Sequence, residues 1–356
     1  MSLGNGWRAL ARAAMILAAV ALPLASAAAQ TRRQSERQCD NKNDAFSPDE
    51  RISACTALIR SGRSSKYDLG TQYYNRGRAY RQKEDYDSAI ADFNEAIELD
   101  PKYIDAYYER GYAYYAKGDY DRAVAEYTEA IRLDPKFTNA YYERGYSYSA
   151  KGDYDSAVAD HTEAIRLDPK FADAYYERGN AYDARGDYDR AVADYTEAIR
   201  LRANNEDAYF ARGRAYFYIG TLPRALADLT TASELNPENA YPALWLDIAN
   251  KRSNLPSRLS AALARIDMTR WPEPVIRLYL GQTTPQAVLA AADNVDAKTR
   301  NERVCDAFFY TGELFLQQGK KADAIGLFRL AAAECVKASF EYEGAVAELR
   351  GLGARP

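Results

Sequence analysis

Two stripes of apolar or small residues, each at helical spacing, lie on either side of a short Gly-Asp turn. In one copy of this pattern the stripes consist of Tyr107, Gly111 and Tyr114, then Ala123, Tyr127 and Ala130. Such spacing predicts two amphipathic helices joined by a tight turn. Asp119 in the turn is suited to begin the second helix, as are Asp153 and Asp187 in later copies. The repeating unit is therefore helix–turn–helix.

The unit returns every 34 residues, as the tripeptide Leu-Asp-Pro shows at Leu99–Pro101, Leu133–Pro135 and Leu167–Pro169. The proline enforces a break before the next unit. A unit of this length cannot bury its apolar face alone, so successive copies are expected to stack into a solenoid. Five units fit between Gly70 and Pro237. The fourth ends in Arg202-Ala203 without the proline, and we expect less regular packing there.

These columns closely resemble the tetratricopeptide repeat: an aromatic residue opens the first helix, a glycine follows four residues later, small residues line the second helix and a proline closes the unit. The resemblance implies an all-α fold, a right-handed superhelical solenoid of antiparallel helix pairs. Solenoids of this family present extended surfaces to other proteins, so the resemblance also implies a binding protein.

The rest of the chain divides into blocks around the five units. Gly312, Phe315, Gly319 and Ala324 fall on repeat columns and predict a further helical pair between Arg303 and Val336, with a capping helix at Phe340–Leu352. The expected order is residues 1–29 as a signal peptide, 30–69 as an N-terminal arm and capping half-repeat, 70–237 as five units, 238–302 as a divergent connector of short helices, and 303–356 as a repeat-like pair with its cap.

The stretch Pro237–Gly353 resembles the C-terminal half of the NlpI-like cell-envelope adaptor lipoproteins. Four motifs carry this resemblance: Leu244-Trp245-Leu246, Leu278-Tyr279-Leu280-Gly281, Phe309-Tyr310-Thr311-Gly312-Glu313-Leu314 and Glu348-Leu349-Arg350-Gly351-Leu352-Gly353. It implies a non-enzymatic scaffold that recruits envelope hydrolases or proteases. Lipidation as in that family would need a cysteine directly after the signal, where this chain has Gln30.

The first 29 residues have the features of an export signal: Arg8 and Arg12, an apolar run over Ala13–Leu24, and an Ala27-Ala28-Ala29 cleavage site. An uncleaved anchor is the alternative, but the apolar run is short and contains Pro23. Cleavage would change the formal net charge from −4 to −6. An acidic chain without basic runs is a poor candidate for nucleic acid or an anionic membrane. We therefore expect a periplasmic, soluble protein without a membrane span.

Four cysteines in an exported chain are consistent with disulfides, and three pairings are open. Proximity favours Cys39–Cys55 and Cys305–Cys335; the second pair would join the two ends of the last helical hairpin. The sequence has no C-x-x-C motif and one histidine, so we expect neither a metal site nor a cofactor.

Catalytic chemistry is not indicated. His161 lies in a column held elsewhere by Phe93, Tyr127, Tyr195 and Leu229, so we interpret it as a core imidazole. No Gly-rich phosphate loop, G-x-S-x-G motif or nucleophile–base constellation accompanies it. The sequence predicts that the protein is not an enzyme.

The 30 tyrosines fall mostly in columns of the repeat. Two columns share the stripe of the repeat glycines and are interpreted as core: Tyr73, Tyr107, Tyr141, Tyr175 and Tyr209, with Tyr80, Tyr114, Tyr148, Tyr182 and Tyr216 seven residues later. A third column lies about 100° round the helix, and the resemblance places it on the concave groove. Its members are Tyr74, Tyr108, Tyr142, Tyr176 and Phe210.

The predicted groove is aromatic and acidic. The residues expected beside the third column are Tyr112, Tyr115, Tyr146, Phe217, Glu109, Glu143, Glu177, Asp105, Asp173 and Asp207. Such a surface favours extended segments that carry Arg, Lys or Pro, through cation–π contacts and charge. It disfavours an anionic C-terminal tail. The alternative is that the rings only cover gaps between adjacent repeats, and both roles can coexist.

Arginines recur in step with carboxylates sixteen residues later: Arg76, Arg110, Arg144, Arg178 and Arg212 with Asp92, Glu126, Asp160, Asp194 and Asp228. Opposite charges with one common period predict an ion-pair ladder between the two helices of each unit.

Three functions compete. The first is a non-enzymatic periplasmic scaffold with a second docking site or dimer interface after Pro237; the second is a chaperone-like carrier of exported or unfolded chains. The third, an enzyme, would need a cleft within Asn254–Asp296. Saturable binding to a few folded partners, weak binding to many denatured chains, and turnover would distinguish them.

Overall fold

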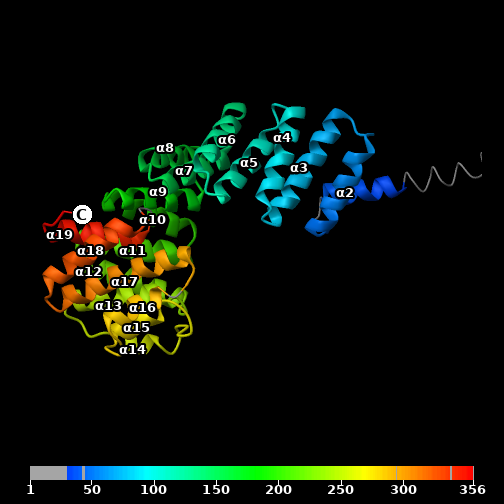
Figure 1. Cartoon of the computed structure of the whole chain (residues 1–356). Coiled ribbons are helices and arrows are strands. Elements are labelled where there is room, and N and C mark those ends of the chain that lie inside the picture. Colours follow the sequence, from blue (N-terminus) through cyan, green and yellow to red (C-terminus); the bar gives the residue numbers. More distant parts are fainter. Residues whose placement is uncertain (1–29, 42–44, 294, 337–338, 356) are drawn as a thin grey trace, which may run out of the picture. The chain divides into compact units, whose positions relative to one another are not determined.

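A computed structural model describes residues 30–41, 45–293, 295–336 and 339–355 (Figure 1). The predicted signal peptide, residues 1–29, lies outside the described residues. Every regular element among the described residues is a helix, which confirms the all-α prediction. Two compact units make up the chain: Met1–Ala140, called unit 1, and Tyr141–Pro356, called unit 2.

A helix over residues 30–40 opens the described chain, and the labelled helices follow in order. Their bounds are α2 Pro48–Ser61, α3 Lys66–Gln82, α4 Tyr86–Leu99, α5 Ile104–Ala116, α6 Tyr120–Leu133, α7 Thr138–Lys151, α8 Tyr154–Leu167, α9 Ala172–Ala184, α10 Tyr188–Leu201, α11 Glu206–Ile219, α12 Leu222–Leu235, α13 Ala240–Arg252, α14 Leu259–Ala262, α15 Glu273–Tyr279, α16 Pro285–Ala292, α17 Ala297–Gln317, α18 Lys321–Glu334 and α19 Phe340–Gly351.

Consecutive helices pack on one another within each unit. In unit 1, α2 packs on α3, α3 on α4, α4 on α5 and α5 on α6. In unit 2 the same order runs from α8 to α13, and α17, α18 and α19 pack together at the end of the chain. Helices α17 and α18 lie where we expected a helical pair between Arg303 and Val336, although α17 already begins at Ala297, and α19 lies where we expected the cap.

The second helix of each 34-residue repeat keeps the same register throughout. Helices α4, α6, α8, α10 and α12 begin at Tyr86, Tyr120, Tyr154, Tyr188 and Leu222. The helix bounds therefore show no break in the 34-residue register after the fourth repeat, and the less regular packing that we expected there stays a prediction. The backbone N–H of Arg202 still donates to the carbonyl of Ala198, so α10 ends without a proline.

Local signals start these helices. The N–H of Arg122 donates to the side chain of Asp119, 3.1 Å, and the preceding Gly118 has a φ of 78°, a left-handed conformation that glycine adopts without strain. Ser156 and Asp153 repeat the same cap. Asp187 instead binds the guanidinium of Arg190 at 2.6 Å.

The repeat glycines bring paired helices into contact. A Cβ at Gly77 would lie 2.7 Å from the ring of Phe93, and a Cβ at Gly179 would lie 2.7 Å from the ring of Tyr195. Gly111, Gly145, Gly213 and Gly312 meet Tyr127, His161, Leu229 and Phe328 in the same way. Each large side chain therefore fills the space that the missing Cβ leaves, which explains why a glycine on the first helix recurs opposite a large side chain on the second.

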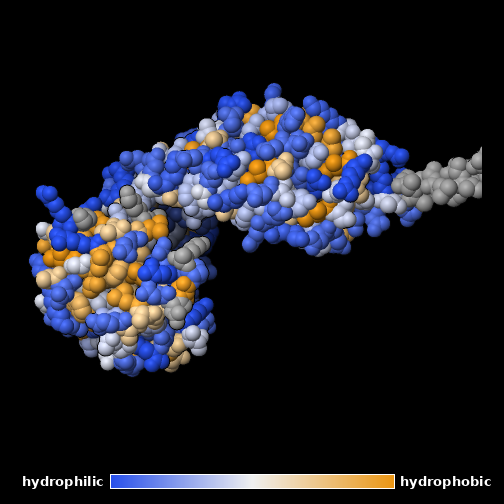
Figure 2. All heavy atoms as spheres, viewed as in Figure 1, coloured by the Kyte–Doolittle hydropathy of each residue, from blue (hydrophilic) through white to orange (hydrophobic). Residues whose placement is uncertain are grey.

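The C-terminal part of unit 2 has a larger apolar core than the repeats. Trp245, Leu244, Ile248, Phe309 and Phe328 are all fully buried in it. On the face seen in Figure 2, unit 1 is largely hydrophilic, with hydrophobic residues separated by polar ones.

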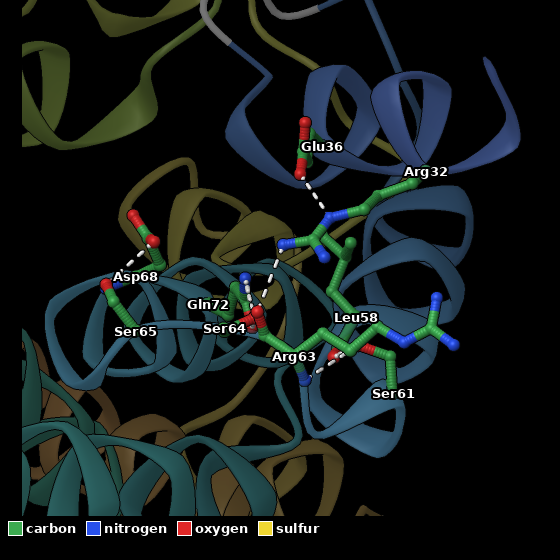
Figure 3. A network of polar contacts seen from close by, with 9 residues as sticks. All are labelled: Arg32, Glu36, Leu58, Ser61, Arg63, Ser64, Ser65, Asp68 and Gln72. Atoms are coloured by element: carbon green, nitrogen blue, oxygen red, sulfur yellow. Dashed lines mark hydrogen bonds and ion pairs between the residues drawn. The ribbon is translucent and has the colours of Figure 1, made fainter. Parts of the chain in front are cut away.

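Both predicted disulfides are confirmed. Cys39 joins the helix at residues 30–40 to α2, with Cα atoms 4.9 Å apart, and Cys305 of α17 joins Cys335 after α18, with Cα atoms 5.5 Å apart. Figure 3 shows how polar contacts also hold the N-terminal helix: Arg32 pairs with Glu36 and donates to the carbonyl of Arg63. None of the helices in the described ranges has the length and apolar character that a membrane crossing requires.

Candidate protein-binding surface

The third tyrosine column lies over the junctions between successive 34-residue repeats. The ring of Tyr74 packs on Tyr103 with centroids 4.9 Å apart, Tyr108 packs on Phe137 at 5.1 Å, and in unit 2 Tyr142 packs on Phe171 at 4.9 Å. All three column rings are half-buried. They therefore cover the gaps between repeats, as one of our two interpretations holds, and keep part of each ring at the surface.

The predicted neighbours of this column differ in exposure. Tyr146 is 37% exposed and stacks on Tyr142, whereas Tyr112 is half-buried under the guanidinium of Arg81, 4.7 Å from its ring centroid. Tyr115, also half-buried, packs on Tyr120. The prediction that Phe217 lines the groove is wrong: it is 3% exposed, because Trp245 and the guanidinium of Arg252 cover its ring.

In unit 1, two arginines neutralise Glu109, the carboxylate next to the third tyrosine column. Glu109 of α5 is buried, and Arg81 and Arg78 of α3 approach it at 2.8 and 3.4 Å. Burial raises the pKa of Glu109, and the two guanidiniums oppose that rise. Arg78 also lies over the ring of Tyr74, 5.8 Å from its centroid. Glu109 is therefore an internal ion pair between two repeats.

Unit 2 treats the equivalent residue differently. Glu177 of α9 accepts a hydrogen bond from the Asn180 amide at 3.1 Å. Burial raises the pKa of Glu177 to about 7; the Asn180 amide opposes the rise, and the charges of Asp173, Asp207 and Glu143 add to it. None of the groups with the largest influence on this pKa is an arginine or a lysine. The nearby Arg202 is already bound to Asp173 at 2.8 Å.

The difference between Glu109 and Glu177 is explained by the residues one repeat earlier. Arg78 and Arg81 precede Glu109 by 31 and 28 residues, and the residues at the same distances before Glu177 are Tyr146 and Ser149. At the repeat positions of the two arginines, this part of the chain therefore has a tyrosine and a serine. We call Glu177, Asn180, Asp173, Tyr142 and Tyr146 the Glu177 site.

The last member of the column, Phe210, does not face solvent in the same way. Its ring makes edge contacts with Trp245 at 6.5 Å and with Phe340 of α19 at 6.1 Å. Arg214, one turn later, pairs with Asp183 at 2.8 Å and lies 3.6 Å from Glu343 of α19. The C-terminal helix of the chain therefore covers this end of the column.

The predicted ion-pair ladder is confirmed in all five units. Arg76, Arg110, Arg144, Arg178 and Arg212 reach Asp92, Glu126, Asp160, Asp194 and Asp228 at 2.6 to 2.7 Å. Several of these arginines also donate to the preceding repeat, as Arg178 does to Thr162. The ladder therefore fixes both the pairing of the two helices in a repeat and the stacking of neighbouring repeats within a unit.

The tyrosines interpreted as core accompany this ladder. Tyr73, Tyr107, Tyr141, Tyr175 and Tyr209 are half-buried, each under the arginine three residues later, with 5.4 to 5.7 Å from guanidinium to ring centroid. The rings of Tyr141, Tyr175 and Tyr209 pack against buried core clusters, in agreement with the core interpretation, while the arginine heads lie over the part of each ring that stays near the surface.

His161 is a core residue, as predicted. It is fully buried, and neither ring nitrogen has a hydrogen-bond partner. Burial lowers the pKa of His161 to about 3, so the imidazole is neutral at ordinary pH. A residue without access to solvent cannot act on a substrate, so the structure offers it no catalytic role.

Comparisons with known proteins agree with this architecture. The TPR repeat family matches residues 77–118, 111–152, 145–184 and 179–220, and a tetratricopeptide repeat matches residues 306–334. No catalytic family is among these matches.

Among solved structures, a tetratricopeptide repeat protein from Parabacteroides merdae is 19% identical, with a TM-score of 0.53 over 71% of this chain and 98% of that one. Pseudomonas aeruginosa PilF is 18% identical, with a TM-score of 0.50 over 61% of this chain and 95% of that one. MamA is 28% identical over 45% of this chain and 93% of that one, with a TM-score of 0.43. The first two likenesses concern the fold.

Proposed function

We propose that the chain, whose residues 77–220 match the TPR repeat family, is a non-enzymatic scaffold that binds partner proteins through the aromatic, acidic column. A basic side chain of the partner would dock at the Glu177 site. Repeats of this kind present protein-binding surfaces. The observation that carries the proposal is the contrast between Glu109, which pairs with two arginines, and Glu177, which accepts a hydrogen bond from the Asn180 amide and lies among like charges.

A lysine or arginine from a partner would supply what Arg78 and Arg81 supply in unit 1. Its charge would meet the carboxylates of Glu177 and Asp173, and its alkyl stem and charged head would lie beside Tyr142 and Tyr146. A cation over a tyrosine face contributes about 0.5–1 kcal/mol at an exposed site and more when water is excluded. Charge complementarity would also exclude acidic segments. Of the other predicted members of the surface, Tyr74, Tyr108, Tyr112, Tyr176 and Glu143 would then extend the contact, whereas Glu109 is buried in its internal ion pair and would act only through the packing of the repeats.

The compartment and the partner class are part of this proposal. The export-like residues 1–29 and the two disulfides support an oxidising compartment such as the periplasm. The resemblance of residues 237–353 to NlpI-like adaptors supports envelope hydrolases or proteases as partners. Residues after Pro237 would provide a second docking site or a dimer interface.

Fluorescence anisotropy with labelled ten-residue peptides would test the basic-segment proposal. A peptide with two lysines separated by proline and glycine is expected to bind, and its counterpart with glutamate at both positions is not. Glu177→Gln should weaken the basic peptide about tenfold or more, since it removes the charge and keeps the shape. Glu334→Gln, an exposed position on α18, is the matched control.

A tyrosine pair separates the ring from the charge. Tyr146→Ala should weaken binding by a smaller factor, about three- to tenfold, while Tyr67→Ala, at a tyrosine 79% exposed on α3, should leave affinity unchanged. Equal affinity for both peptides, or an unchanged affinity in Glu177→Gln, would refute the basic-segment proposal.

The carrier alternative uses the same rings without selectivity. It predicts that reduced, unfolded proteins of any charge compete with the basic peptide. Competition by unfolded acidic and basic proteins alike would favour a carrier over an adaptor.

A further inference from the structure

Helix α19 lies on the end of the aromatic column in unit 2. Phe340, its first residue, contacts Phe210 and also Tyr241, with ring centroids 6.1 and 5.6 Å apart. The guanidinium of Arg214 lies 5.1 Å from the same ring. One turn later, a Cβ at Gly344 would lie 2.6 Å from the ring of Phe309. The helix is therefore seated closely against the fifth repeat and α17.

Three glutamates of α19 are directed into this contact, and each meets another carboxylate. Glu341 is buried and hydrogen-bonds to Asp306 of α17. Asp306 also accepts from the Tyr241 hydroxyl at 2.8 Å and from the Trp271 indole at 2.6 Å. Glu302 of α17 adds a further negative charge near Asp306. The donors to this first pair, Tyr241 and Trp271, are neutral, and its charged neighbour Glu302 is an acid.

The second and third pairs each have one arginine. Glu348 hydrogen-bonds to Glu313 of α17, which is fully buried, and Arg252 of α13 reaches both carboxylates at 2.9 and 3.1 Å. Tyr218 of α11 faces this pair.

Glu343 shares Arg214 with Asp183 of α9, at 3.6 and 2.8 Å respectively. Tyr154, Tyr188 and Tyr195, from α8 and α10, face it.

Six buried or nearly buried carboxyl groups therefore share two guanidiniums along one helix. Two carboxylates that face each other away from water do not both ionise readily, so such a pair holds a proton. If all six groups were ionised, α19 and the helices that it packs against would both carry uncompensated negative charge at their contact. The helix docks without that repulsion when the pairs are protonated.

We propose that α19 is a built-in, pH-sensitive occupant of the repeat surface: it stays docked while its three carboxyl pairs retain their protons, and it detaches when they ionise, uncovering Phe210 and Arg214. Detachment would extend the aromatic column to its last member. The proposal does not depend on basic-segment binding at the Glu177 site.

The directions of the pKa shifts agree with this geometry. Burial raises the pKa of Glu343 to about 8, with the charge of Asp183 adding to the rise and Arg214 opposing it. Burial likewise raises the pKa of Glu341 and of Glu313 far above the usual range. The docked helix thus binds more protons than the detached one, so docking weakens as pH rises. For each proton released, the docking constant falls up to tenfold per pH unit.

Hydrogen–deuterium exchange of the full chain, followed by mass spectrometry of a peptide spanning residues 340–351, tests this. After correction for the intrinsic exchange rate, protection of α19 should fall between pH 5.5 and 8.5 by at least about a hundredfold. Peptides from α3 and α4 of unit 1, which contribute no residue to this contact, serve as internal references and should keep their protection. No peptide ligand is needed, so a failure of the proposed function would not affect the result.

Glutamine mimics a protonated glutamate, so the variant Glu341→Gln/Glu343→Gln/Glu348→Gln should keep α19 protected across the same range. Glu334→Gln, exposed on α18, should behave as the wild type. If the triple variant does not fold by circular dichroism, Glu343→Gln alone should remove part of the pH dependence.

A steric pair tests the seating independently of charge. Gly344→Leu should expose α19 at every pH, whereas Gly351→Ala, where a Cβ meets nothing within 4 Å, should not. Constant protection of the wild type from pH 5.5 to 8.5, or an equal fall in the triple glutamine variant, would overturn the proposal.

Discussion

Units 1 and 2 carry the same glutamate at the same repeat position and use it in opposite ways. Glu109 is buried between Arg78 and Arg81 of the preceding repeat, whereas Glu177 has the Asn180 amide and like charges around it. A carboxylate that recurs with the period is therefore not necessarily architectural. Its role depends on the residues one repeat earlier, because the first helices of adjacent repeats bring those positions together.

The largest predicted effect is a loss of stability when the two arginines of unit 1 are removed. Arg78→Ala/Arg81→Ala leaves Glu109 buried without a cation, which should lower the free energy of unfolding by about 3 kcal/mol. Urea unfolding followed by circular dichroism measures the change. Arg132→Ala, in an exposed pair with Glu129, is the control and should cost about 0–1 kcal/mol. Adding Glu109→Gln should recover much of the loss; a double variant as stable as the control would contradict the neutralisation of Glu109.

The reverse exchange makes unit 2 resemble unit 1. Tyr146→Arg/Ser149→Arg places two guanidiniums where Arg78 and Arg81 stand relative to Glu109. The added arginines would occupy the Glu177 site, so affinity for the basic peptide should fall about a hundredfold, or about 2.7 kcal/mol. Anisotropy titration measures this, with Tyr67→Arg/Thr71→Arg on α3 as a charge-matched control. Undiminished binding would show that the peptide docks elsewhere.

Much of the fold could be predicted because the repeat is local. The 34-residue spacing, the Gly-Asp turns and the helix-pair ion ladder all follow from residues within about one unit of each other. The disulfides also follow, because Cys305 and Cys335 stand at neighbouring ends of one hairpin.

The candidate site could be predicted only in part, because its differences arise between units. The periodic columns identified Glu109 and Glu177 but gave them one role. Comparing residues 28 and 31 positions earlier would have separated them. The docking of α19 on Phe210 joins residues 130 positions apart, and no local pattern specifies such a contact. The burial of Phe217 has the same origin, because Trp245 and Arg252 come from the helix after the last regular repeat.

The two units should also differ in stability at acid pH, because of the core column that contains Phe93, Tyr127 and His161. Unit 1 has Phe93 and Tyr127 where unit 2 has His161, whose folded pKa is about 3 against an ordinary 6.5. Below pH 6.5 the unfolded chain takes up a proton that the folded chain does not, so stability falls as pH falls, by about 2 kcal/mol at pH 5. His161→Phe should remove this loss. Urea midpoints at pH 5 and 7.5 measure it, and equal pH dependence in both proteins would contradict the neutral buried imidazole.

The smallest effect concerns the ionisation of Glu177 itself. Because burial raises the pKa of Glu177 to about 7, part of the protein at neutral pH carries a protonated carboxyl that cannot attract a cation strongly. A basic peptide binds the ionised form, so its affinity should fall about tenfold, or about 1.4 kcal/mol, for each pH unit below 7 and level off above pH 8. Anisotropy titrations from pH 5.5 to 8.5 measure the curve. Glu177→Gln should flatten it, and the arginine-neutralised Tyr146→Arg/Ser149→Arg variant should flatten it too, since the added cations hold Glu177 ionised. A slope that survives in Glu177→Gln would assign the titration to another carboxylate, with Asp173 and Asp207 the next to replace.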